Sequence, residues 1–185
     1  MRSLRINTRF CLLATLVVAI GLGSLVMAQD DAPRKKGKPL TEDSLVDFLE
    51  GLGYSVKATK NSNGSTTANL TFEVGTWTLY PTVSLSPDKS IVWITVGLVK
   101  LEKGIPDDII VKIFAENEKD LKFFSMNPST RLLKINLPLP NYDNLTPAYF
   151  REQMDFLKRR IGQTEDLWNP KKWSGGGSGG GKDGD

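Results

Sequence analysis

The sequence has no histidine, and its single cysteine, Cys11, lies close to the N-terminus. Histidine is the commonest general base and a frequent metal ligand, and a thiolate is the usual soft ligand and sulfur nucleophile. Serine–histidine triads are therefore excluded, and zinc hydrolysis and thiol redox chemistry are excluded once the leader that carries Cys11, described next, is removed. One cysteine also cannot form an intramolecular disulfide, so packing alone must stabilise the fold. The chemistry still open is a carboxylate pair, a Ser–Lys dyad or an all-oxygen calcium site.

Residues 1–28 have the anatomy of a secretory signal peptide. Three arginines precede an apolar run over residues 10–22, and Val26 and Ala28 place small side chains where a signal peptidase cleaves. We expect cleavage after Ala28, a secreted or periplasmic location, and no membrane segment afterwards. The alternative is an uncleaved anchor, because residues 10–28 approach the ~20 residues that span a bilayer. The glycines and the serine within that run favour cleavage.

The charge balance changes once the leader is removed. The whole chain has 24 basic and 21 acidic residues, and the three leader charges are all arginine. The mature chain therefore carries 21 of each sign. A neutral domain has no electrostatic footprint for nucleic acid or anionic lipid, so we expect neither as a partner.

The mature chain has one candidate domain between two polar segments. Residues 29–39 form a charged Pro/Lys spacer, and residues 171–185 form a flexible Gly-rich tail. Residues 40–170 between them have the usual size of a domain with one core.

Three segments of this domain have helical periodicity. The first begins at Thr41, the second opens at Pro106 and stops near Asn117, and the third is capped by Thr146 with Pro147 at its first position. The apolar stripe of the first is Leu45, Phe48, Leu49 and Leu52, and that of the third is Phe150, Met154, Leu157 and Ile161.

The remaining segments alternate with a period of two. They are Val56 with Ala58, residues 68–74, 77–85 and 91–101, and a hairpin of residues 121–126 and 131–137. The sequence therefore predicts an α+β fold in the order α-βββ(β)-α-ββ-α. In it, three helices pack on an antiparallel sheet of about five to six strands.

The segment 91–101 is apolar on both of its faces. Val92, Ile94, Val96 and Leu98 point one way, and Ile91, Trp93, Val99 and Leu101 point the other. A second apolar face needs a cover. One interpretation is a central strand covered by a helix or by the chain terminus. The other is a partner-binding or dimer face formed by Trp93, Tyr80, Ile91 and Val99.

Several literal motif matches lack the structural context that their chemistry needs. The Gly176–Gly180 match to the nucleophile elbow lies in a glycine tail, and the Ser-x-x-Lys match at residues 86–89 lies in a predicted turn. Asp107 and Asp108 suit the first turn of a helix. The acids at 116–120 lack the spacing of a calcium loop. We predict no catalytic residue, no metal site and no cofactor.

The chain resembles the bacterial YbjN-type domain, also called sensory transduction regulator, whose fold resembles that of type III secretion chaperones. The resemblance covers about residues 41–170. It is carried by Leu52-Gly53-Tyr54, Val83-Ser84-Leu85-Ser86-Pro87-Asp88 ahead of Trp93, Ile105-Pro106 ahead of Asn117, Leu133 with Leu137, Asn144-Leu145-Thr146-Pro147 with Arg151, and Thr164 through Leu167-Trp168. It implies a non-enzymatic module, and in the secretion chaperones that fold dimerises and cradles an extended polypeptide.

These observations favour an exported protein- or peptide-binding module, monomeric or weakly homodimeric, that is not an enzyme. Two alternatives stay open. One is a carboxylate-dependent hydrolase acting on an envelope polymer, and the other is a passive structural component of the envelope.

Overall fold

The computed structural model describes residues 38–102, 104–143 and 145–173. The predicted leader, the cleavage site after Ala28, most of the spacer and the glycine run of the tail lie outside these residues. None of the helices in this part of the chain has both the length and the apolar composition of a bilayer-spanning segment.

The described residues form eight strands and four α-helices. In order they are α1 (Ser44–Gly51), β1 (Lys57–Lys60), β2 (Thr66–Asn69), β3 (Phe72–Val74), β4 (Trp77–Leu79), β5 (Pro81–Leu85), β6 (Ile91–Lys100), α2 (Asp107–Asn117), β7 (Phe123–Met126), β8 (Leu132–Pro140), α3 (Pro147–Gln163), α4 (Glu165–Trp168) and the short 3-10 helix η1 (Pro170–Lys172).

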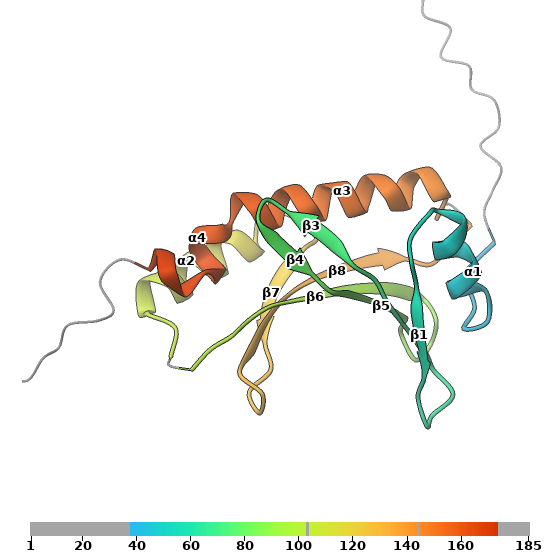
Figure 1. The fold of residues 1–185 in the computed structure, drawn as a ribbon, viewed down its shortest axis with the longest axis horizontal. Helices are drawn as coiled ribbons and strands as arrows, with labels where there is room; N and C mark the ends of the chain where they lie inside the picture. The colour runs from blue at the N-terminus through green and yellow to red at the C-terminus, as the bar shows by residue number, and fades with distance from the viewer. Residues whose placement is uncertain (1–37, 103, 144, 174–185) are drawn as a thin grey trace, which may run out of the picture. The chain divides into compact units, whose positions relative to one another are not determined.

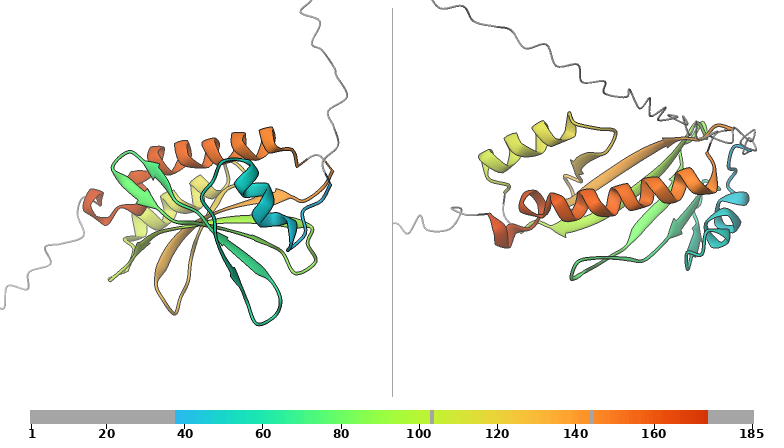
Figure 2. Two further views of the ribbon diagram at one scale, coloured as in Figure 1. Left: turned by 45° about the vertical axis from the view of Figure 1, so that its right-hand side comes forward. Right: turned by 90° about the horizontal axis from the view of Figure 1, so that it is seen from above.

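One antiparallel sheet contains six of these strands, in the order β1-β2-β5-β6-β8-β7. The helix α3 runs along one side of this sheet (Figures 1 and 2). Both α1 and α2 contact α3 on that side, because Phe48 packs edge-on against Phe150 and Glu116 pairs with Arg160. The predicted α+β class and element order are confirmed.

The helix α3 follows its sequence signals closely. Thr146 Oγ1 accepts the N–H of Tyr149 at 3.2 Å, and Pro147 occupies the first turn. A Pro at the first position suits a helix because that N–H has no helical partner. The predicted stripe is fully buried against the sheet and consists of Phe150, Met154, Leu157 and Ile161.

The predicted strands 68–74 and 77–85 are each broken in two. The end of the first, β3, and the start of the second, β4, pair with each other as a separate hairpin, which we call the arm (residues 70–80). Proline cannot donate a backbone hydrogen bond, so β5 begins at Pro81, whose carbonyl accepts the Leu70 N–H at 2.8 Å. Gly75 turns the hairpin with a φ of 58°. The arm then lies against α3, as Figure 1 shows.

Candidate binding surface

The side of the sheet that faces away from α3 is lined by every second residue of each strand, and these residues pair across neighbouring strands. Ser84, Trp93 and Pro138 stand in one row, and Thr82, Thr95, Asn136 and Phe123 stand in the next. We call this side the open face. Its members on the six strands are Lys57, Thr59, Thr67, Asn69, Thr82, Ser84, Ile91, Trp93, Thr95, Gly97, Lys100, Phe123, Ser125, Leu132, Lys134, Asn136, Pro138 and Pro140.

Burial alternates between the two sides of the sheet. Val83, Ile94 and Leu137 on the helix side are fully buried, whereas Trp93, Thr95 and most of their open-face neighbours are partly exposed. Within the described ranges, no helix lies over the open face (Figures 1 and 2). An exposed sheet face with large apolar side chains is typical of an interaction surface.

Two aromatic rings form the centre of the open face. Trp93 of β6 and Phe123 of β7 meet edge to face, with ring centroids 6.1 Å apart and an interplanar angle of 89°. The intervening strand β8 supports them through Asn136, which is only 8% exposed. Its amide accepts from Thr95 Oγ1 at 3.1 Å and donates to Ser125 Oγ at 2.8 Å. Because the polar groups of the Asn136 side chain have hydrogen-bond partners, this side chain is held in one position on the strand between the two rings.

The four predicted partner-binding residues do not all lie on the same surface of the structure. Ile91 and Trp93 lie on the open face, and Tyr80, which immediately precedes β5, is 65% exposed. A β-bulge between Gly97 and Val99 sets Val99 opposite the buried Leu133, so Val99 is partly buried against the core instead. The bulge thus changes which side of the sheet the end of β6 presents.

Sequence reasoning missed two members of this surface, Phe123 and Asn136. Phe123 precedes another phenylalanine, so alternation alone does not decide which of the two faces the core. Asn136 was visible as the single amide within the apolar run of β8, and a polar residue in such a run indicates a position off the core face.

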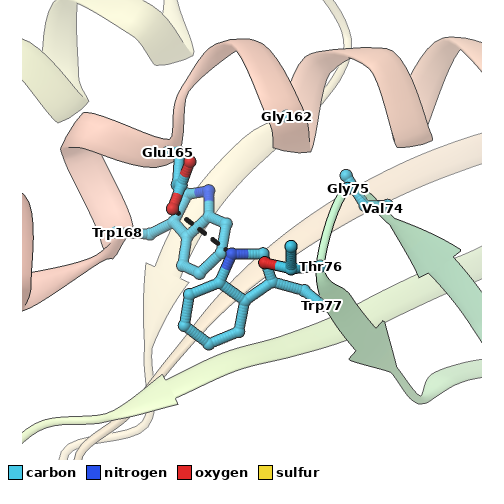
Figure 3. Close-up of a pocket in the computed structure, with 7 residues that line it drawn as sticks. All are labelled: Val74, Gly75, Thr76, Trp77, Gly162, Glu165 and Trp168. Carbon is cyan, nitrogen blue, oxygen red and sulfur yellow. Dashed lines mark hydrogen bonds between the residues drawn. The ribbon is translucent and has the colours of Figure 1, made fainter.

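A small cavity of about 290 Å³ lies between the arm and the C-terminal end of α3 (Figure 3). Trp77 and Trp168 meet there with centroids 5.1 Å apart, and Trp77 Nε1 donates to Glu165 Oε1 at 3.3 Å. Glu165 also accepts from Lys172 at 2.6 Å and from Asn169 at 2.8 Å. These donors, foremost Lys172, hold the pKa of Glu165 below its usual value.

These contacts indicate a structural role for Glu165, which connects the arm to α4 through its hydrogen bond with Trp77. It is also the one carboxylate among the residues that line this cavity, whereas glycoside hydrolysis uses two. In the described part of the chain, no group of three or more acidic residues is arranged to hold a metal ion.

The Ser-x-x-Lys match occupies the tight turn between β5 and β6. Ser86 Oγ donates to Asp88 Oδ1 at 2.5 Å and accepts the Ile91 N–H at 3.0 Å. The hydrogen bonds from Ser86 and then Ser90 lower the pKa of Asp88 to about 2. The serine hydroxyl therefore closes the turn.

Comparison with known proteins found similar chains among solved structures alone. No family model and no curated protein matches the sequence. A chain from the HopA1–SchA chaperone–effector complex is similar with a TM-score of 0.45 and 15% identity, over 68% of this chain and 99% of that one. A chain from the ExsC–ExsE complex is similar with a TM-score of 0.48 and 13% identity, over 66% and 90% of the two chains. Both TM-scores are below 0.5, so the proposals that follow rest on the surface of this chain itself.

Proposed function

We propose that this protein is an exported protein-binding module that holds an extended segment of a partner on the open face and performs no chemistry of its own. The observation that carries the proposal is the half-exposed Trp93–Phe123 pair at the centre of an uncovered sheet face. The leader-like residues 1–28 support export.

The surroundings of the ring pair suit a polypeptide. Buried aromatic rings carry much of the energy at protein interfaces, and polar groups around them fix the register of the partner. Here the hydroxyl groups of Ser84, opposite Trp93, and of Thr82 and Thr95 in the next row lie beside Trp93. An extended segment would place alternate side chains on the rings and its backbone groups near these hydroxyls.

Site-specific photocrosslinking in the native host tests this proposal. A photoreactive amino acid replaces Ser84 on the open face, and a matched control places it at the exposed Glu152 on α3. We expect one reproducible adduct with another protein from position 84 and none from position 152. The adduct should disappear in Trp93→Ala while the melting temperature of that variant stays close to that of the parent.

Two results would overturn the proposal. One is crosslinking from position 152 with none from position 84. The other is an adduct whose partner is a second copy of this chain, which would make the open face a dimer interface.

A further inference from the structure

We infer, on the basis of the proposed function, that the segment held on the open face is acidic. The first observation is compositional. The six strands of the main sheet contain four lysines, Lys57, Lys60, Lys100 and Lys134, and no aspartate or glutamate. The mature chain has equal numbers of acidic and basic residues, so the acid-free sheet reflects placement and not overall composition.

Three of these lysines lie on the open face. Lys134 stands beside Gly97 and Ser125 in the row next to Phe123, Lys57 faces Asn69 at the β1 edge, and Lys100 faces Leu132. Among the described residues, none of the three forms an ion pair. The fourth, Lys60, is turned to the helix side, where it lies 3.6 Å from Asp43.

The carboxylates gather in the opposite layer. The helices contain Asp47 and Glu50 of α1, Asp107, Asp108 and Glu116 of α2, Glu152 and Asp155 of α3, and Glu165 and Asp166 of α4. The same helices also carry five cations, Lys112, Arg151, Lys158, Arg159 and Arg160, so they have an excess of four negative charges, whereas the strands of the main sheet have an excess of four positive charges. An approaching acidic chain is therefore favoured on the sheet side over the helix side.

The spacing on the open face also fits an acidic chain with interspersed aromatic or aliphatic residues. An extended segment presents alternate side chains on opposite sides. Its apolar side chains would contact Trp93 and Ile91, and its carboxylates would reach Lys134 and, at the sheet edge, Lys57. Charges on the rim of such a surface are screened over about 8 Å at physiological ionic strength, so the attraction is salt-dependent.

Fluorescence anisotropy with labelled polymers tests the inference on the mature chain, residues 29–185. The probes are a random Glu–Tyr copolymer, a Lys–Tyr copolymer of the same length and an oligothymidylate. We expect the Glu–Tyr copolymer to bind at least tenfold more tightly than the other two, and to weaken several-fold between 50 and 300 mM NaCl.

Two charge-reversal variants make the test specific. The triple variant Lys57→Glu, Lys100→Glu, Lys134→Glu should lose the preference for the Glu–Tyr copolymer. The matched control Lys112→Glu, Arg159→Glu, Lys171→Glu changes three exposed cations of the helix layer and should keep it. Thermal unfolding of both variants verifies that each is folded.

The results separate this inference from the proposed function. Equal binding of both copolymers, abolished by Trp93→Ala, would remove the acidic preference and leave the peptide-binding function standing. Tight binding of the oligothymidylate would overturn the inference in favour of a general polyanion surface. Binding of no polymer would also overturn it, and the crosslinking experiment would then decide the proposed function independently.

Discussion

Glu116 forms ion pairs with three cations of the helix layer and its margin. Its carboxylate is 6% exposed and pairs with Lys122 at 2.9 Å, with Lys119 at 2.6 Å and with Arg160. Lys122 has a fully buried side chain and a second contact to Asp120 at 3.2 Å. This cluster joins the end of α2, the start of β7 and the end of α3. Buried ions of this kind are tolerated because each one is paired.

We expect Glu116→Gln to lower the free energy of unfolding by about 3 kcal/mol at pH 7, because the substitution leaves Lys122 buried with only one counter-charge. The measurement is urea denaturation followed by circular dichroism. Glu118→Gln, an exposed neighbour on the same segment, is the matched control and should change stability little. Equal stability of the two variants would show that the cluster contributes nothing.

At the scale of elements, the two edges of the main sheet differ. The β1 edge is exposed along its whole length, whereas the β7 edge is blocked by the side chain of Asn117 at the end of α2. Asn117 Oδ1 accepts the Phe124 N–H at 2.6 Å, and its Nδ2 donates to the Phe124 carbonyl at 3.1 Å. Both outward backbone groups of this strand residue are thus occupied, which prevents pairing with another strand.

Asn117→Ala should expose those two backbone groups of Phe124. We expect a loss of about 1–2 kcal/mol in the free energy of unfolding, because the N–H and the carbonyl of Phe124 lose their hydrogen-bond partner. We also expect concentration-dependent association, detectable by analytical ultracentrifugation. Asn63→Ala, in the exposed β1–β2 turn, provides the control. A monomeric Asn117→Ala variant of parental stability would contradict this role.

Trp77 contributes to the attachment of the arm, together with the buried Phe72 and Leu79. Trp77→Ala removes both the edge contact with Trp168 and the hydrogen bond to Glu165, whereas Trp77→Phe removes mainly the hydrogen bond. We expect faster amide hydrogen exchange across residues 72–79 in Trp77→Ala and an intermediate rate in Trp77→Phe. Exchange in β6 serves as the internal reference. Unchanged exchange in the arm would show that strand pairing and the buried Phe72 and Leu79 hold it without Trp77.

The sequence predicted those elements whose local signals agree with their packing. Thr146, Pro147 and the apolar stripe of α3 specify a capped amphipathic helix without any tertiary information. The arm could not be predicted, because alternation with a period of two continues through Leu70 and Tyr80 and does not show that the pairing partner changes. The bulge beside Gly97 was equally hidden, so Val99 was assigned to the side of Trp93.

At the scale of the whole molecule, acid should weaken the fold. Burial of Glu116 raises its pKa, but the hydrogen bonds from Lys119 and Lys122 and the charges of Lys122 and Arg160 outweigh that effect and lower it. The pKa of Glu165 is lowered as well. A carboxyl with a depressed folded-state pKa stabilises the fold above its unfolded value, and that contribution is lost as the pH falls through the folded value.

The free energy of unfolding should therefore be constant from pH 7 to about 5 and should decrease below the ordinary glutamate value of 4.5. Denaturation series at pH 7, 5, 4 and 3 measure this dependence. The free energy of unfolding should decrease less steeply with falling pH in Glu116→Gln, since that variant has one fewer group that takes up a proton on unfolding. A slope identical to that of the parent would assign the acid sensitivity to other carboxyls.

The distribution of the four tryptophans gives the protein a built-in optical probe. Trp77, Trp168 and Trp173 are packed in or against the core, and Trp93 alone lies on the open face. A molecule seated on that face would change the emission of a single indole above a constant background from the other three. Occupancy can therefore be followed by unlabelled fluorescence spectroscopy, and Trp93→Phe would supply the spectrum of the background.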